Sequence, residues 1–188
     1  MLLADQGAEV IKIESPEGDA MRAAGPSRNS KGMGPLHLHV NRNKRSLCLD
    51  LKQKAARDAL LKVIATADAL VHSMRPQAIE RLGLGYEAVA KVNPSIVYVG
   101  GYGYAADGPY GELPAYDDAI VARFGLAGLM GQTAEDGTPR YPPTIVADKT
   151  VGLTLAFSTL SALMHRQRTG EGQFVEVPMF ETMTAWLM

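Results

Sequence analysis

The chain has little cysteine, little net charge and no long apolar run, and each shortage excludes a class of protein. Its 188 residues include one cysteine, Cys48, which excludes an intrachain disulfide framework and a cysteine-based metal site. The formal net charge is −1, so no overall field favours nucleic acid as a partner. No apolar run reaches the roughly 20 residues of a membrane span. These shortages favour a reducing, cytoplasmic setting with neither nucleic acid nor a membrane as partner.

What remains is the composition of an ordinary globular protein. Hydrophobic residues make up 46% and charged residues 21% of the chain, and 188 residues suffice for one domain with a core. Cys48 lies in an alternating strand-like run, residues 46–51, and we expect it to be a small buried residue. The chain opens on what resembles the last turns of a helix and closes on an apolar helical pattern without a stop signal. We therefore expect part of a larger protein.

Strand-like and helix-like patterns alternate along the chain. Apolar, β-branched runs predict strands at residues 9–14, 46–51, 69–72, 95–100 and 173–177. Helical patterns fill most of the spaces between them, including one from Asp117 to Met130. This alternation is typical of an α/β layer fold with a mainly parallel sheet, in which working loops follow the carboxyl ends of strands. The loops in suitable places are residues 15–35, 72–76, 100–117 and the one that reaches Asp148.

Asp148 stands where an apolar run gives way to a long helical pattern that stops at Gly170. The pattern is apolar on two faces, which predicts a buried helix. The two faces are Val151, Leu155, Thr159 and Ala162, and Leu153, Phe157, Leu160 and Met164. Asp148 has two interpretations at this stage: a helix N-cap, or a carboxylate nucleophile beside a pocket. Asp117 likewise precedes a helix and is expected as a cap or as part of a site.

Other motifs give weaker indications of a binding or catalytic site. Residues 101–106 match G-x-G-x-x-A, but a turn at 107–109 follows them, so no helix N-terminus is expected there to hold a dinucleotide pyrophosphate. The histidines show no helical i, i+4 spacing with a second ligand, so we expect no metal site. Five cations could hold phosphate groups at strand ends or be solvated surface charges. They are Lys44, Arg45, Lys52, Arg75 and Arg81.

Taken together in order, these segments resemble the family III CoA-transferases, also called the CaiB/BaiF family. The resemblance extends over nearly the whole chain, and the ordered set is more specific than any one string. The strings are LLADQGAEVIKIESPEGD, NRNKRSLCLDLK, the segment from Arg75 to Tyr86, NPSIVYVGGYGYAADGPY, PAYDD and ADKTVGLTLAFSTLSALMHRQRTGEGQFVEVPMFE. The resemblance implies a Rossmann-like, mainly parallel α/β fold with flanking helices.

The resemblance implies that Asp148 is the nucleophile of a CoA transfer. In that chemistry the carboxylate attacks an acyl-CoA thioester, a mixed anhydride and an aspartyl-CoA thioester follow, and an acceptor carboxylic acid collects the CoA. The CoA thioester is a substrate, and no permanently bound cofactor is implied. The family's contacts to CoA and substrate fall on Leu49, Asp50, Leu51, Lys52, Ser73, Met74, Arg75, Arg81, Pro114, Ala115, Tyr116 and Asp117.

Two rival functions remain open. Tyr116 stands where the racemases of the family place a histidine base, and a tyrosine, with a reference pKa of about 10, is a poor base near neutral pH. This favours a transferase over an α-methylacyl-CoA racemase. The second rival is a fragment that binds CoA or a partner chain without turnover. Full members of the family are about twice as long and form interlocked homodimers. The resemblance thus implies one partial large domain without its first strand and without the small domain.

Overall fold

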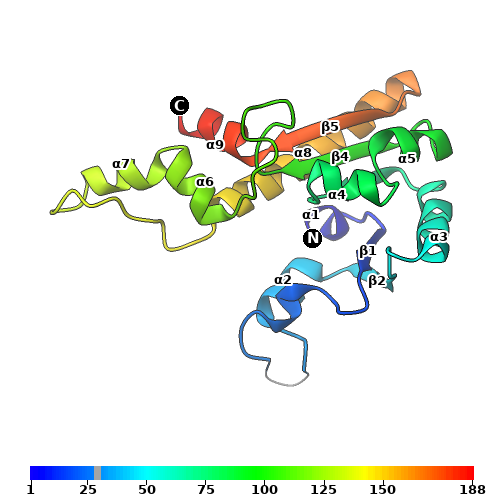
Figure 1. Cartoon of the computed structure of the whole chain (residues 1–188), viewed down its shortest axis with the longest axis horizontal. Helices are drawn as coiled ribbons and strands as arrows, with labels where there is room; N and C mark the ends of the chain where they lie inside the picture. Colours follow the sequence, from blue (N-terminus) through cyan, green and yellow to red (C-terminus); the bar gives the residue numbers. More distant parts are fainter. Residues whose placement is uncertain (28–30) are drawn as a thin grey trace. The chain divides into compact units, whose positions relative to one another are not determined.

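The structure is a computed structural model that describes residues 1–27 and 31–188 (Figure 1). The chain forms two units, Met1–Val63 and Ile64–Met188, and each contains its own sheet. Every strand pair in the described residues is parallel. The expected mainly parallel α/β fold is therefore confirmed. The predicted loop at 15–35 includes residues 28–30, which lie outside the described residues.

The first unit is built on a parallel pair of short strands. β1 (Val10–Glu14) pairs with β2 (Lys44–Cys48), with Val10 opposite Lys44 and Glu14 opposite Cys48. Around them lie α1 (Leu2–Asp5), the 3₁₀ helix η1 (Ala20–Ala23), α2 (Pro35–Asn41) and α3 (Lys54–Ile64), which reaches the boundary between the units.

The buried Glu14 fastens the start of the loop after β1. Its carboxylate accepts two hydrogen bonds from the Arg22 guanidinium, at 2.8 and 2.9 Å, and one from the Ser46 hydroxyl at 2.9 Å. The Arg22 hydrogen bonds lower the pKa of Glu14 to about 2, against the effect of burial. Glu14 thus remains an ionised acceptor that links η1, β1 and β2.

Cys48 corrects an expectation, because its side chain is exposed rather than buried. It lies at the end of β2, whose only sheet partner among the described residues is β1. The alternation of residues 46–51 predicts that one face of the strand is buried. A strand in a two-stranded sheet, however, leaves much of its surface uncovered.

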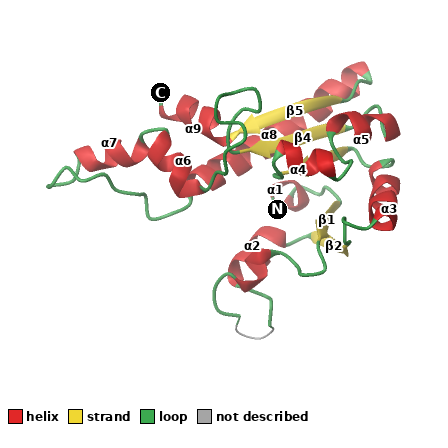
Figure 2. Cartoon of the chain, in the orientation of Figure 1, coloured by secondary structure: helices red, strands yellow, loops and turns green. Residues whose placement is uncertain are grey.

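The second unit contains a three-stranded sheet in the order β3-β4-β5 (Figure 2). Its strands are β3 (Ala69–His72), β4 (Val97–Tyr102) and β5 (Gln173–Pro178). All six residues of the central strand β4 are buried, as expected for a strand with two sheet neighbours and helices against it. The helices are α4 (Pro76–Arg81), α5 (Tyr86–Val92), α6 (Asp117–Arg123), α7 (Leu126–Gln132), α8 (Val146–Thr169) and α9 (Met179–Leu187).

The helix expected from Asp117 to Met130 is two helices. α6 ends at Arg123, and Gly125 adopts φ +94°, a left-handed conformation that stops a right-handed helix and that glycine adopts at little cost. α7 begins at the next residue, Leu126. The apolar periodicity continued through this break, so the pattern alone did not reveal it.

The long helix α8 is buried on one face only, which corrects the prediction of a helix buried on most sides. Val151, Thr159 and Ala162 are buried and face the sheet, behind which α8 runs in Figure 1. The second apolar face is exposed. Its members are Leu153, Phe157, Leu160 and Met164, with Phe157 71% exposed. The repeating pattern recorded apolar residues, whereas burial also requires a covering element.

Substitutions on the two faces of α8 should therefore differ in cost. We expect Phe157→Ser to change the free energy of unfolding by less than about 0.5 kcal/mol, because the ring is exposed and the two residues have similar helix propensity. Val151→Ala, on the buried face, should cost about 2 kcal/mol through lost burial and a small cavity. Urea unfolding followed by circular dichroism measures both. Equal losses in the two variants would show that the Phe157 face is covered.

Candidate functional site

The second unit gathers the expected site segments at one edge of its sheet. Because its strands are parallel, their carboxyl ends lie together, with His72 opposite Gly100 and Tyr102 opposite Pro178. In Figure 2 the arrowheads of β4 and β5 point to the same end, where the green loop between β4 and α6 lies. This is the edge at which open α/β sheets bind ligands.

Asp148 lies in the first turn of α8 and is not its cap. The N-cap residue is Ile145, which makes no side-chain capping hydrogen bond, and Asp148 is the third helical residue. The capping interpretation is thus wrong, because the helix begins at Val146. The Asp148 side chain is exposed, and among the described residues no hydrogen bond or ion pair engages its carboxylate. A free carboxylate at a helix N-terminus is available for chemistry.

Asp117 holds the backbone at Asp148. The Asp148 N–H donates a hydrogen bond to Asp117 Oδ1 at 2.9 Å, and this link joins the start of α6 to the start of α8. Asp117 was expected as a possible cap of its own helix, but the N-cap of α6 is Tyr116 and no side chain caps it. The Tyr116 side chain is 76% exposed. The first turns of two helices are therefore fixed against each other by one acidic residue.

The pKa of the Asp148 carboxyl is raised above its ordinary value. The largest cause is partial desolvation by the surrounding protein, although the side chain reaches solvent, and the neighbouring Asp117 carboxylate adds to it. Lys149 acts in the opposite direction. Two carboxylates at close range disfavour each other's ionised form. The arrangement thus yields a carboxylate that is more basic than usual.

Asp117→Asn should lower the pKa of Asp148. Asparagine keeps an oxygen that can accept the Asp148 N–H, but it removes the negative charge that disfavours ionisation of Asp148. Titration of the Asp148 carboxyl carbon by NMR measures this shift. Asp118→Asn is the matched control, because the Asp118 carboxylate accepts a hydrogen bond from Ala119 N–H in its own helix. An unchanged or higher pKa in Asp117→Asn would contradict this electrostatic assignment.

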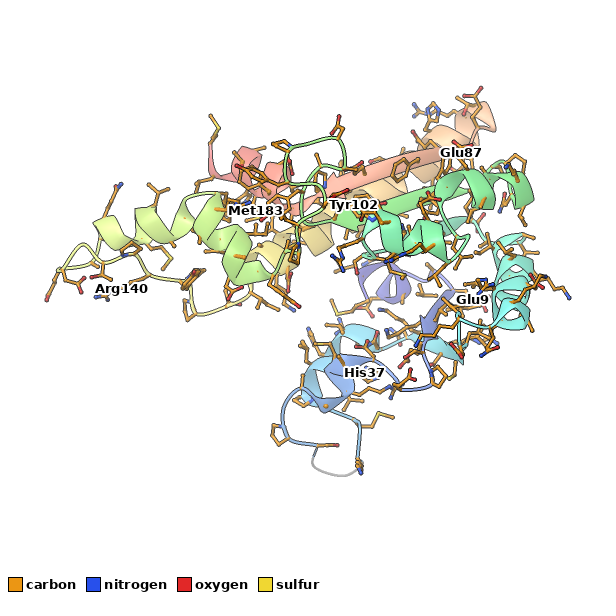
Figure 3. All side chains as sticks on the ribbon, in the orientation of Figure 1. Glu9, His37, Glu87, Tyr102, Arg140 and Met183 are labelled. Atoms are coloured by element: carbon orange, nitrogen blue, oxygen red, sulfur yellow. The ribbon has the colours of Figure 1, made fainter. Side chains whose placement is uncertain are left out.

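The segment after β3 carries three expected contact residues, Ser73, Met74 and Arg75, and all three are exposed. His72 shapes the turn, since its Nδ1 accepts a hydrogen bond from Met74 N–H at 3.2 Å. Burial lowers the pKa of His72 to about 4, so its imidazole is neutral near pH 7. Its ring packs edge-on against Tyr98 and against Tyr102, which Figure 3 labels at the end of β4.

The structure brings this segment and the β4–α6 loop to the same edge. Gln77 on α4 donates a hydrogen bond to Glu112 in that loop at 3.4 Å. Arg81, on the same helix, is exposed, and its Nε donates to the Gln77 carbonyl. Pro114 lines an open hollow of about 530 Å³ together with Tyr104, Leu113, Ala119, Ala122 and Arg123. The Gln77–Glu112 hydrogen bond therefore joins α4 to the β4–α6 loop within one unit.

The remaining expected contacts, Leu49 to Lys52, lie in the first unit directly after β2. Leu49 N–H donates to the Glu14 carbonyl at 2.8 Å, and Lys52 N–H donates to Asp50 Oδ1 at 3.0 Å. The Arg57 guanidinium reaches the carbonyls of Leu51 and Lys52, at 2.9 Å each. These bonds form a defined turn from which the Lys52 side chain extends into solvent.

Sequence patterns missed two glutamates at this edge. The N–H groups of Ala105 and Ala106 donate to Glu181 Oε1 at 3.2 Å and to Glu176 Oε1 at 2.7 Å. These amides belong to the G-x-G-x-x-A string, so carboxylates already occupy donors that a dinucleotide phosphate would need. No local signal reveals such a contact, because the partners are 76 and 70 residues apart in the sequence.

The described residues lack two further features, a metal-binding cluster and a membrane-spanning helix. Residues 1–27 and 31–188 contain no cluster of three or more His, Cys, Asp or Glu side chains placed to hold a metal ion. In the same part of the chain, none of the helices has the length and apolar character needed to cross a membrane.

Comparison with known proteins gives consistent matches along the whole chain. The family described as CoA-transferase family III matches residues 1–188. The acetyl-CoA:oxalate CoA-transferase of Acetobacter aceti is 37% identical over 188 residues, which cover 99% of this chain and 47% of that protein. The succinate–glutarate CoA-transferase of Agrobacterium fabrum is 34% identical over 193 residues, covering 99% and 48% respectively.

Solved structures agree with these matches. The crystal structure of a CAIB/BAIF family protein from Brucella suis superposes with a TM-score of 0.91 at 34% sequence identity. The matched region covers 98% of this chain and 49% of that one. The chain thus spans about half the length of the relatives and structures that it matches.

Proposed function

The chain belongs to CoA-transferase family III, and from this membership we propose that it moves CoA from an acyl-CoA thioester to a carboxylic acid. Two relatives that match 99% of this chain are named as CoA-transferases of small acids, namely oxalate in one case and succinate and glutarate in the other. The proposed substrates are accordingly an acyl-CoA and a free carboxylic acid, with CoA as the group transferred and no permanent cofactor.

One observation carries the assignment of Asp148 as nucleophile: the 2.9 Å hydrogen bond from its backbone N–H to Asp117. This bond fixes the main chain at Asp148 while the Asp148 carboxylate stays exposed. The raised pKa means that the ionised carboxylate is more basic, and therefore a better nucleophile, than an ordinary aspartate. Position and basicity together favour covalent catalysis over a purely structural role.

The proposed reaction has four displacement steps. An Asp148 oxygen attacks the thioester carbonyl carbon, the carbon–sulfur bond breaks, and a mixed anhydride and CoA thiolate form. The thiolate then attacks the Asp148 carbonyl of the anhydride, which releases the first carboxylate and leaves an aspartyl-CoA thioester. The acceptor carboxylate attacks the carbonyl carbon of that thioester, which expels CoA thiolate and forms a second mixed anhydride. The thiolate then attacks the acceptor's carbonyl carbon in this anhydride, which gives the new acyl-CoA and frees the Asp148 carboxylate.

We propose roles in CoA and substrate binding for the remaining contact residues from their charge and their position in the fold. Lys52 and Arg81 are exposed cations suited to the phosphates of CoA. Ser73, Met74 and Arg75 follow β3, and Pro114 to Asp117 lead into the first residue of α6, so both segments would line the thioester end of the same site. Leu49 to Leu51 would contribute through the turn that supports Lys52. The interlocked homodimer and the cytoplasmic setting stay predictions from the family resemblance.

The test is a CoA-transfer assay with a panel of short acyl-CoAs and isotope-labelled acids, beginning with acetyl-CoA, succinyl-CoA, oxalate and glutarate. Mass spectrometry should find the label in a new acyl-CoA. Exchange of the α-proton with solvent deuterium, without transfer, would instead support the racemase. Unaltered acyl-CoA with measurable CoA binding would support a binding fragment.

A further inference from the structure

The β4–α6 loop, residues 103–116, is fastened at its start by the β5–α9 segment. Ala105 and Ala106 donate their N–H groups to the carboxylates of Glu181 on α9 and Glu176 on β5. Between these two glutamates, Phe180 N–H donates to the Gly103 carbonyl at 3.0 Å. Three hydrogen bonds therefore fix the first residues of the loop, and two of them are strengthened by a negative charge.

The beginning and the end of the same loop pack tightly against each other. A Cβ added to Gly103 would lie 2.2 Å from the Cβ of Ala115, so the beginning and the end of the loop touch. A Cβ added to Gly111 would lie 2.6 Å from the Ala106 carbonyl oxygen. Because these contacts are too tight for even a methyl group, a shift at the start of the loop moves its end.

The end of the loop leads directly to the proposed nucleophile. Ala115, which packs on Gly103, stands two residues before Asp117, and the Asp117 carboxylate accepts the Asp148 N–H. A continuous series of contacts thus runs from the two glutamates through the loop to the first turn of α8.

We propose that Glu176 and Glu181 are positioning residues for the transfer site, acting through the β4–α6 loop on Asp117 and Asp148. Their carboxylates bind backbone amides and have no role in touching substrate. The kinetic part of this proposal rests on the proposed function, whereas its structural part does not.

Residue-resolved amide hydrogen exchange tests the structural part. In the double variant Glu176→Ala/Glu181→Ala, the amides of Ala105 and Ala106 should exchange at least about tenfold faster, because each loses a charged acceptor. The proposal further requires faster exchange at Leu113 and Asp148, whose N–H groups donate to the Tyr110 carbonyl and to Asp117 Oδ1. The variant Glu176→Gln/Glu181→Gln, which keeps an acceptor oxygen, should restore most of the protection. Unchanged exchange at Leu113 and Asp148 would overturn the proposal.

If the double alanine variant does not fold, the single variants Glu176→Ala and Glu181→Ala carry the same test. Each should release its own partner amide and also accelerate exchange at Leu113 and Asp148. Glu171→Ala is the matched control, since Glu171 is an exposed glutamate just before β5 whose backbone N–H, and not its carboxylate, makes the local hydrogen bond.

The kinetic part is tested by kcat and KM for CoA transfer. We expect the alanine variants to lower kcat about tenfold at an unchanged folded fraction, and the glutamine variants to recover it to within about threefold. A merely structural role would reduce the folded fraction and leave kcat per folded molecule unchanged, which would overturn this part. Absence of transfer in the unaltered chain would instead count against the proposed function. The structural part of the proposal would then be decided by hydrogen exchange alone.

Discussion

Replacing Asp148 with asparagine is expected to lower the rate of CoA transfer by about 10³-fold or more, because the amide cannot form the mixed anhydride. The substitution keeps the size and shape of the side chain. Asp148 is exposed, so the free energy of unfolding should change by less than about 0.5 kcal/mol. Steady-state transfer assays and urea unfolding measure the two quantities on the same preparation.

The control for this prediction is Asp118→Asn, an exposed acid on α6 whose carboxylate accepts a hydrogen bond from the neighbouring Ala119 N–H. Its transfer rate should stay within about twofold of the unaltered chain, as for most surface substitutions. Retention of full activity by Asp148→Asn would contradict the assignment of the nucleophile, since a structural role leaves the chemistry unchanged.

Tyr98→Ala should have the largest effect on stability, about 3 to 5 kcal/mol. Tyr98 lies in the central strand β4 and is 1% exposed. Its ring packs edge-on against His72, Tyr86 and Phe174, at centroid distances of 5.1, 5.7 and 5.6 Å. A loss of this size removes a large part of the stability of an ordinary domain.

The matched variant Tyr98→Phe keeps the ring and removes only the hydroxyl. That hydroxyl donates to the Leu84 carbonyl at 2.9 Å, so its loss leaves a buried acceptor unpaired and should cost about 1 to 3 kcal/mol. Val71→Ala, on an exposed position of β3, is the background control. Urea unfolding should rank the three losses with Tyr98→Ala first, and a loss in Tyr98→Ala no larger than in Val71→Ala would contradict the described core.

Local patterns predicted the strands and the parallel sheet, because β-branched runs bounded by turns determine strands such as β3 and β4, but they did not predict the helix α2. They located Asp148 near a helix start but placed the helix boundary three residues late, with Asp148 instead of Ile145 as the N-cap. They also predicted burial for Phe157 and Cys48, which are exposed. A pattern records the character of side chains, whereas exposure depends on which elements cover them.

The links within the candidate site were beyond local patterns for a different reason. Asp117 and Asp148 are 31 residues apart, and the glutamate contacts to the β4–α6 loop join still more distant residues. Such hydrogen bonds arise only when the sheet brings the carboxyl ends of its strands together. Tyr102, labelled in Figure 3, lies at that edge and packs edge-on against His72 of β3 at a centroid distance of 5.8 Å.

Trapping of the activated carboxyl tests the central claim most directly. The chain is incubated with each acyl-CoA of the panel, treated with hydroxylamine, and mapped by peptide mass spectrometry. We predict a hydroxamate at Asp148 with at least one acyl-CoA and none in Asp148→Asn. A chain that circular dichroism shows to be folded, yet that forms no hydroxamate at Asp148 with any acyl-CoA, would contradict the account.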